Sequence, residues 1–168
     1  MYTGQVNFGE LSVTESLTAA IEFARTADLY GVTGMEVQIA EHIKALINNS
    51  SPPYGYEFDS NTYLINLKHI TSAVHLPQAH PVREILAAAL VRGYFREDEH
   101  KFVKESREIL GFSSNLLEVV KSALKTLSKG SYEASITDPI SGKKIWLKWT
   151  IFMSTSMAGY CTEIYHED

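Results

Sequence analysis

Two helix-start signals near the beginning of the chain, each followed by an apolar pattern of helical period, constrain the fold most. Ser12-Val13-Thr14-Glu15 has the spacing of a capping box, in which side chains bind backbone N–H groups that the helix leaves free. Thr33-Gly34-Met35-Glu36 repeats this spacing, and Gly31 favours the left-handed turn that ends a helix. The sequence therefore predicts two back-to-back helices. Their apolar residues are Leu17, Ala20, Ile21, Ala24 and Ala27 in the first and Met35, Ile39, Ile43, Leu46 and Ile47 in the second.

A second helical region is expected beyond a proline-containing loop. Residues 50–61 include two prolines and several small polar residues, which do not continue a helix. Pro81 suits the first position of a helix, because its missing N–H would have no partner there. Asn115 begins a third capping signal, Asn-x-x-Glu. The expected helices run from Thr62 to Val74, from Pro81 onward, from Phe102 to Leu110, and from Asn115 to Gly130.

The pattern changes from helical to extended after Gly130. Residues 132–137 alternate between apolar and polar side chains, which is typical of a half-buried strand. Residues 138–143 predict a turn, and residues 144–153 are rich in β-branched and aromatic side chains. We therefore expect a β-hairpin, and a weaker pattern at 160–164 leaves a third strand open.

Together these patterns predict a mainly α fold with a small β element. The expected architecture is a helical array of about six helices followed by a C-terminal β-hairpin. The expected organisation is a helical hairpin at residues 1–49, a Pro-rich loop at 50–61, a helical extension at 62–130, and a β-hairpin and tail at 131–168.

Composition and charge exclude several classes of protein. Fifteen basic and twenty acidic residues give a net charge of -5, whereas a general nucleic-acid binder neutralises phosphates and needs the opposite sign. Nucleic acid is thus a disfavoured partner. No apolar run approaches the roughly 20 residues that span a bilayer, so no membrane association is expected. A single cysteine, Cys161, excludes a disulfide within the chain and fits an intracellular location, in the nucleus or cytoplasm.

Catalytic and metal-binding motifs are not apparent in the sequence. His69, His75 and His80 lack the i, i+4 spacing of a helical zinc site, and one cysteine cannot form a closed Cys-rich site. Ser122 and Lys125 have Ser-x-x-Lys spacing, but no companion hydrolase motif accompanies them. We therefore expect no catalytic residue, no metal site and no cofactor, and predict that the protein is not an enzyme.

Two short motifs frame the first predicted helix. Tyr2-Thr3-Gly4-Gln5-Val6 precedes it, and Ala24-Arg25-Thr26-Ala27-Asp28-Leu29-Tyr30-Gly31-Val32 ends it. They resemble the Tyr-Thr-Gly step and the Ala-Ala-Asp-x-Tyr helix end of the BTB/POZ domain, and the helix from Thr33 takes the place of that domain's last helix. Met35 stands where leucine is common. His80-Pro81-Val82-Arg83-Glu84-Ile85-Leu86 is similar to the helix after the domain in fungal-type members.

The resemblance covers only the C-terminal half of the BTB fold plus a helical extension. In that family a three-stranded sheet and several helices precede the Tyr-Thr-Gly step, at which this sequence begins. The two predicted helices still need cover for their apolar stripes, since each buried Leu or Ile contributes about 1.5–3 kcal/mol. We expect the helices at 62–130 to provide part of this cover, and a residual apolar face to drive self-association or partner binding.

Basic and aromatic side chains are the candidate partner-binding residues. Lys121, Lys125 and Lys129 recur every four positions, so a continuous helix would place them on one side, either as a solvated face or as a patch for an acidic partner. If Ile145, Leu147 and Trp149 cover the helices, Trp146 and Phe152 lie on the opposite face of the hairpin. They would then form an interface, unless another strand covers them.

The sequence thus predicts a protein–protein interaction module, an adaptor or scaffold of BTB/POZ type. The resemblance further implies a role in ubiquitin ligase assembly or transcription regulation. The expected partner is another protein or a second copy of the chain. An enzyme with no recognisable motif and a truncated product without independent activity remain the alternatives, and the sequence makes no prediction about a small-molecule ligand.

Overall fold

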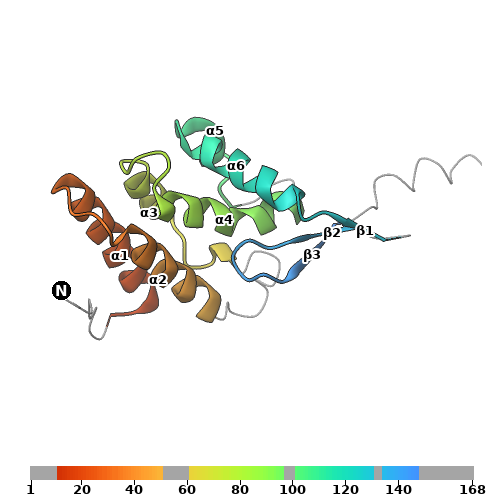
Figure 1. Ribbon diagram of the computed structural model, residues 1–168, viewed down its shortest axis with the longest axis horizontal. Coiled ribbons are helices and arrows are strands. Elements are labelled where there is room, and N and C mark those ends of the chain that lie inside the picture. Colours follow the sequence, from red (N-terminus) through yellow and green to blue (C-terminus); the bar gives the residue numbers. More distant parts are fainter. Residues whose placement is uncertain (1–10, 51–60, 97–100, 131–133, 148–168) are drawn as a thin grey trace, which may run out of the picture.

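The computed structural model describes residues 11–50, 61–96, 101–130 and 134–147. Within them, six helices precede a small antiparallel sheet, which confirms the predicted mainly α fold with a C-terminal β element (Figure 1). The elements are α1 (Val13–Leu29), α2 (Glu36–Asn49), α3 (Leu67–Ala73), α4 (Pro81–Arg96), α5 (Glu105–Glu108), α6 (Phe112–Leu124), β1 (Ser128–Lys129), β2 (Ala134–Thr137) and β3 (Lys144–Leu147).

Helices α1 and α2 form the predicted hairpin, and local hydrogen bonds set its first half. Ser12 and Glu15 make the reciprocal capping box, with the Ser12 N–H donating to the Glu15 carboxylate at 2.9 Å. Gly31 has a φ of +66°. Its N–H donates to the Asp28 carbonyl at 3.0 Å, and the Val32 N–H donates to the Ala27 carbonyl at 2.8 Å. This pair of bonds is a Schellman motif, and it ends α1 at the position predicted from Gly31.

The prediction of a second capping box was wrong. Helix α2 begins at Glu36, its N-cap residue is Met35, and no side chain caps it. The Glu36 carboxylate instead accepts a hydrogen bond from the Gly34 N–H at 2.8 Å. Thr33 therefore lies outside the helix, and the acidic side chain stabilises the turn between α1 and α2.

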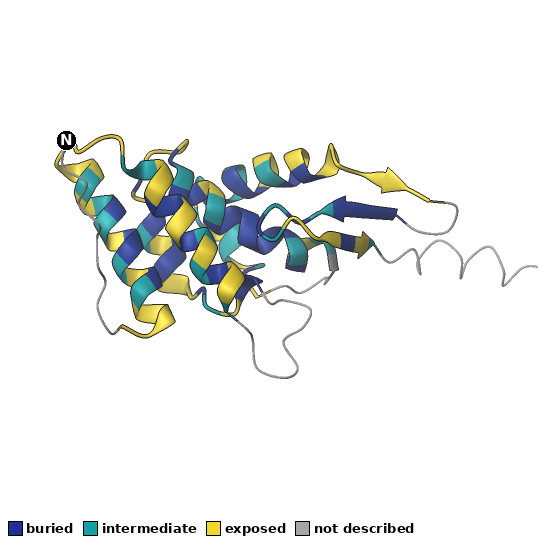
Figure 2. Cartoon of the chain, turned by 60° about the horizontal axis from the view of Figure 1, so that its bottom comes forward, coloured by how far each residue is buried: buried dark blue, intermediate teal, exposed yellow. Residues whose placement is uncertain are grey.

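The apolar faces of α1 and α2 are covered by the chain's own later helices. Leu17, Ile21 and Ile43 are fully buried. Helix α3 packs against α1, and α4 packs against α2, so the described residues include the other half of this core (Figure 2). Cover from the region 62–130 was expected and is confirmed.

Helix α4 is the centre of the fold. It contacts α2, α3, α6 and β3, and residues 86–91 are buried in an unbroken run. This central stretch is apolar on every side, so it needs neighbours all round, whereas the ends of the helix carry charged residues such as Glu84. Pro81 occupies its first position, as predicted.

One buried cation ties three helix ends together. The guanidinium of Arg83, in the first turn of α4, donates to the carbonyl oxygens of Leu76 at 2.9 Å and Gly111 at 2.8 Å, and to the Asn115 side-chain oxygen at 3.0 Å. A fourth, longer bond of 3.4 Å reaches the carbonyl of Val74. Burial lowers the pKa of Arg83. Backbone dipoles at the end of α3 and the start of α6 thus solvate a charge that is largely removed from water.

The start of α6 differs from the prediction because of this cation. Asn115 does not cap the helix; it lies buried in the first turn, between Arg83 and the Gln78 carbonyl, to which its amide donates at 2.8 Å. Gly111 is the N-cap residue, with a φ of +82°, and a Cβ there would lie 2.8 Å from the Arg83 guanidinium. A glycine is therefore required for close packing as well as for backbone conformation.

Three other predicted helices are shorter than expected. The helix predicted from Thr62 begins at Leu67, because the Asn66 side chain accepts from the His69 N–H at 3.1 Å. The helix predicted through Phe102–Leu110 is reduced to α5. Helix α6 ends at Leu124 and not at Gly130.

The sheet contains the predicted hairpin, flanked by a strand that was predicted as helix. Strand β2 pairs antiparallel with β1 and with β3, in the order β1-β2-β3. In this register Ile136 faces Ile145, and both are buried. The expected third strand at 160–164 lies outside the described residues.

A buried carboxylate fixes the hairpin turn to the segment before α3. Asp138 accepts from the Asn61 amide at 2.9 Å, from the Ile140 N–H at 3.0 Å and from the Ser141 hydroxyl at 2.7 Å. The Asn48 amide, near the end of α2, donates to the Ile140 carbonyl at 3.1 Å. Two of these four donors, Asn48 and Asn61, thus join distant parts of the chain to one turn.

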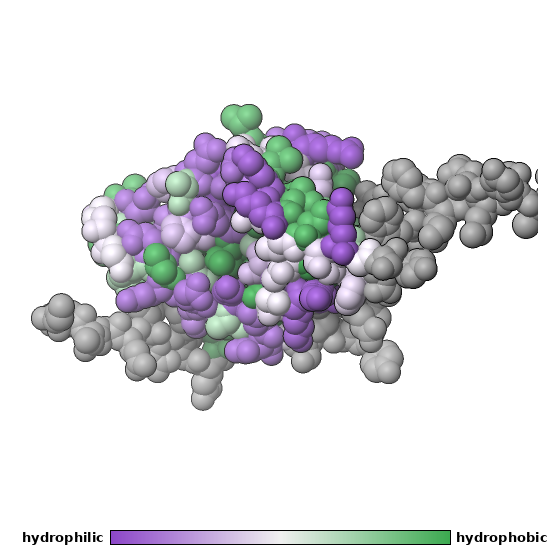
Figure 3. Space-filling model, turned by 45° about the vertical axis from the view of Figure 1, so that its right-hand side comes forward, coloured by the Kyte–Doolittle hydropathy of each residue, from purple (hydrophilic) through white to green (hydrophobic). Residues whose placement is uncertain are grey.

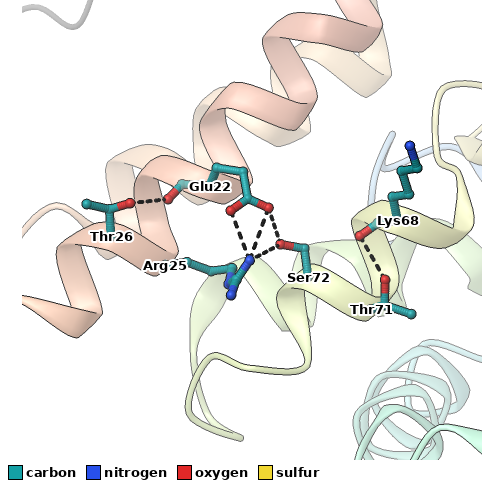
Figure 4. Close-up of polar contacts among 6 residues, drawn as sticks. All are labelled: Glu22, Arg25, Thr26, Lys68, Thr71 and Ser72. Atoms are coloured by element: carbon teal, nitrogen blue, oxygen red, sulfur yellow. Dashed lines mark hydrogen bonds and ion pairs between the residues drawn. The ribbon is translucent and has the colours of Figure 1, made fainter.

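Polar side chains join α1 to α3. Arg25 donates to the Glu22 carboxylate at 2.9 Å and to the Ser72 hydroxyl at 3.0 Å, and Ser72 donates to Glu22 (Figure 4). Closer to the start of α1, the buried His69 ring lies 2.8 Å from the Thr18 hydroxyl. Its Nδ1 accepts from the Asn66 N–H at 3.2 Å, so its Nε2 carries the proton and donates to Thr18.

The Arg83 contacts predict a large effect on stability. Arg83→Met should lower the free energy of unfolding by about 3 kcal/mol, because it leaves buried oxygen atoms without donors. Urea denaturation measures this change. Arg107→Met, at an exposed position in α5, is the matched control and should change the value by less than about 0.5 kcal/mol. An Arg83→Met variant as stable as the parent would contradict the assigned role.

His69 predicts how stability depends on pH. Burial, and to a lesser degree the positive charge of Lys101, lowers the pKa of His69 below its ordinary value of 6.5. Between the two pKa values the unfolded chain binds more protons, so the stability that this group contributes is complete above pH 6.5 and is lost as the pH falls toward the folded value. His69→Gln should flatten the slope of unfolding free energy between about pH 7 and pH 5.

The control for this measurement is His75→Gln, because His75 is exposed. It should leave the slope unchanged in urea titrations at each pH. Equal slopes for His69→Gln and the parent would contradict the assignment.

Candidate protein-interaction surfaces

The end of the α1–α2 hairpin presents large apolar side chains to solvent. Leu29 and Tyr30 are 79% and 76% exposed, and Val32 and Val37 are also exposed. We call these four residues the hairpin-end patch. Single exposed apolar residues are ordinary, but four between positions 29 and 37 form the kind of cluster found at protein interfaces. The Schellman motif sets the backbone from which three of them project.

A hollow of about 280 Å³ lies beside this patch, between the hairpin and the start of α4. Asp28 and Glu36 are among its lining residues and give it an acidic rim. His80 also lines it, and its Nδ1 accepts from the Val82 N–H at 3.2 Å. Burial lowers the pKa of His80, although Asp28 and Glu36 act in the opposite direction. The imidazole is therefore neutral near pH 7, and the hollow carries net negative charge.

A larger groove of about 860 Å³ runs between α4 and α6, and we call it the α4–α6 groove. The two helices lie side by side and run in the same direction (Figure 1). Its apolar lining comes from Ile85, Ala88, Val119 and Pro139, and its charged residues are Glu84, Glu118, Lys121 and Lys125. Glu84 lies near the start of α4 and Glu118 at the middle of α6, whereas the lysines lie toward the end of α6, so the groove is electrically asymmetric along its length.

Two of the three predicted lysines belong to this groove. Lys121 lies in α6 and Lys125 at its C-cap. The prediction that Lys129 shares a continuous helical face with them was wrong. The N–H groups of residues 126 and 127 close onto the last turn of α6, and Lys129 then pairs with Ala134 in the sheet. The basic patch is thus shorter than the four-residue spacing indicated.

Trp146 lies on the face of the hairpin expected for it. Trp146 is 48% exposed, whereas its neighbour Ile145 is buried. The Lys144 ammonium lies 5.6 Å from the ring centroid, within the range of a cation–π interaction. The predicted companion Phe152, and Trp149, lie outside the described residues.

An exposed row of leucines along α6 was missed by the sequence analysis. Leu117 is 60% exposed and Leu124 is also exposed, two turns apart on the same side of the helix. Leu110, before the helix, and Leu127, after it, are exposed as well. On the side of the molecule that holds α6 and the sheet, apolar side chains gather on an otherwise largely polar surface (Figure 3). The seven-residue spacing of Leu110, Leu117 and Leu124 is the sequence pattern from which this row could have been predicted.

The buried polar groups described above, such as Arg83, Asp138 and His69, hold elements of the fold together. Among these residues, no group of three or more His, Cys, Asp or Glu side chains is placed to hold a metal ion. Nor does any helix in this part of the chain combine the length and hydropathy required to cross a membrane. The arrangement presents apolar surfaces with charged borders, which suit contact with another macromolecule.

Trp146 gives a test that separates surface from core. Trp146→Ser should cost about 1 kcal/mol of stability, since the ring is half exposed, and should weaken association if this face is an interface. Ile145→Ala, at the adjacent buried position, should cost about 3 kcal/mol. Thermal unfolding followed by circular dichroism compares them, and equal losses would place the Trp146 ring in the core.

Comparisons with known proteins give no information on function, so a functional proposal has to rest on these surfaces. No protein-family model matches the chain, and no curated protein or solved structure matches it. The resemblance of residues 1–47 to a BTB/POZ domain therefore stays a prediction that rests on the motifs themselves.

Proposed function

We propose that this protein is a protein–protein interaction module that binds its partner through the hairpin-end patch. The observation that carries the proposal is the exposure of Leu29, Tyr30, Val32 and Val37 together at one end of the molecule. Binding would remove these side chains from water, and their burial is the main source of the affinity.

The surroundings of the patch support a preorganised site. Helices α1 and α2 are held by α3 and α4, and the turn between them is fixed by backbone hydrogen bonds. Little conformational freedom would be lost on binding, which favours affinity. Asp28 and Glu36 border the adjacent hollow, so the partner that fits best offers an apolar anchor flanked by basic residues.

The BTB/POZ resemblance suggests the biological setting for this module. We propose an adaptor or scaffold acting in the nucleus or cytoplasm, in ubiquitin ligase assembly or transcription regulation. The support is that the motifs behind the resemblance frame α1 and the turn that carries the patch. The ligase role is specific enough to test with a purified cullin as the probe.

Affinity purification of the full-length protein tests the proposal. Leu29→Asp/Val37→Asp should lose specific partners by at least about tenfold, because each charge replaces an apolar contact at the centre of the interface. Quantitative mass spectrometry of the retained proteins provides the readout, and direct binding to the purified cullin tests the ligase role.

The matched control is Leu67→Asp, an exposed leucine at the start of α3. It should retain the same partners as the parent, and circular dichroism should show that all variants fold. If the double variant retains every partner that the parent retains, the hairpin-end patch is not the binding site.

A further inference from the structure

We propose that the hollow beside the hairpin-end patch binds an arginine side chain of the partner protein, and that a carbonyl oxygen of the partner accepts a hydrogen bond from the His80 ring. This rests on the proposed function and names the partner chemistry that the same site selects. Val32 belongs both to the patch and to the lining of the hollow, so one bound segment covers both. The occupant is thus an apolar segment of the partner that carries an arginine.

The size and lining of the hollow suit one long side chain. Its volume of about 280 Å³ lies just below the roughly 300–1,000 Å³ of pockets that bind drug-sized ligands. Met35, Ile39 and Pro81 line it, together with Ala24 and Ala27 of α1. The aliphatic stem of a long basic side chain therefore finds apolar contacts inside, while its charged head stays near the rim.

Two carboxylates provide the charge that an arginine head requires. Asp28 and Glu36 line the hollow, and both act on the pKa of His80, so both lie near its imidazole. Neither forms an ion pair with another described residue, although Glu36 accepts a hydrogen bond from the Gly34 N–H. A guanidinium has five N–H donors in a planar fork that matches carboxylates, whereas the ammonium of lysine is a compact point charge. The site therefore favours arginine.

Positive charges near the hollow are weaker or already engaged. The starts of α2 and α4 each carry about half a positive charge, and the end of α1 carries about half a negative charge. Arg83 also acts on His80, but its guanidinium is held by the carbonyls of Leu76 and Gly111 and by Asn115, and it does not belong to the lining. The two full carboxylate charges therefore outweigh these contributions.

His80 gives the second, independent indication of a ligand. It is only 6% exposed and lines the hollow. Because its Nδ1 accepts from the Val82 N–H, the neutral ring carries its proton on Nε2. Within the described part of the chain, this second N–H has no hydrogen-bond acceptor. A buried donor without an acceptor costs free energy, so a carbonyl oxygen bound in the hollow would remove that cost.

An NMR titration of the full-length protein with Nα-acetyl-arginine N-methylamide tests the proposal. This probe combines a guanidinium with amide carbonyl groups. The methyl signals of Met35 and Ile39 should shift with a dissociation constant on the order of 1 mM, because one side chain makes few contacts. The corresponding citrulline compound has nearly the same shape without the charge. It should bind at least about fivefold more weakly.

A second ligand isolates the hydrogen bond of His80. The Nε2–H signal of His80 should move on binding of Nα-acetyl-arginine N-methylamide, whose carbonyl groups accept hydrogen bonds. The n-butylguanidinium ion has the same head and a similar stem but no carbonyl group. It should shift the Met35 and Ile39 methyl signals and leave the Nε2–H signal in place.

Variants locate the site. Asp28→Asn/Glu36→Gln should weaken binding of the arginine probe by at least about fivefold, because it removes both charges and preserves side-chain size. The matched control is Glu41→Gln, which is exposed on α2 outside the lining and should bind the probe within about twofold of the parent. Leu29→Ser/Val37→Ser should also bind within about twofold, since neither residue lines the hollow. Circular dichroism should report a native fold for each variant.

Four results would overturn the proposal. They are unshifted Met35 and Ile39 methyl signals at about 10 mM probe, equal binding of the citrulline compound, undiminished binding by Asp28→Asn/Glu36→Gln, and an Nε2–H signal of His80 that ignores the carbonyl groups. None of these results bears on the partner test of the hairpin-end patch. Conversely, patch variants that keep every partner while the parent binds the probe would refute the proposed function and leave the hollow as an arginine site.

Discussion

The guanidinium of Arg83 is the interaction on which the arrangement of the later helices depends. A cation inside a protein is tolerated only when polar groups replace the water it has lost. Here the carbonyl oxygens of Leu76 and Gly111 and the Asn115 amide do so. Among the described residues no carboxylate forms an ion pair with it. Because these oxygens belong to the end of α3 and the start of α6, the charge fixes both relative to α4, and with them the walls of the α4–α6 groove.

Local signals predicted the fold well where local interactions decide the structure. The Ser12 capping box, Gly31 and Pro81 set helix ends through bonds within a few residues, and all three were confirmed. The same kind of signal failed at Thr33 and Asn115. The Asn115 side-chain oxygen instead accepts a hydrogen bond from the buried Arg83, which is distant in sequence. A capping motif contains no information about such a long-range partner.

The interaction surfaces were only partly predictable, because exposure is decided by what remains uncovered after packing. The spacing of Lys121 and Lys125 along a helix was sufficient to place them together, whereas the early end of α6 removed Lys129 from their row. Leu29 and Leu117 read as ordinary helix residues in the sequence. Their exposure follows from where α3 and α4 stop covering the hairpin, and from α4 occupying only one side of α6.

The Asp138 turn has a consequence for the order in which the molecule can be completed during synthesis. It holds Asn61 from 77 positions earlier, and the neighbouring Ile140 carbonyl holds Asn48 from 92 positions earlier. Because the ribosome releases the chain from its N-terminus, α1 and α2 emerge well before these partners exist. The apolar faces of α1 and α2 are therefore open to solvent and to chaperones until α3 and α4 emerge, and the bonds of Asn48 and Asn61 form only after the Asp138 turn has left the ribosome.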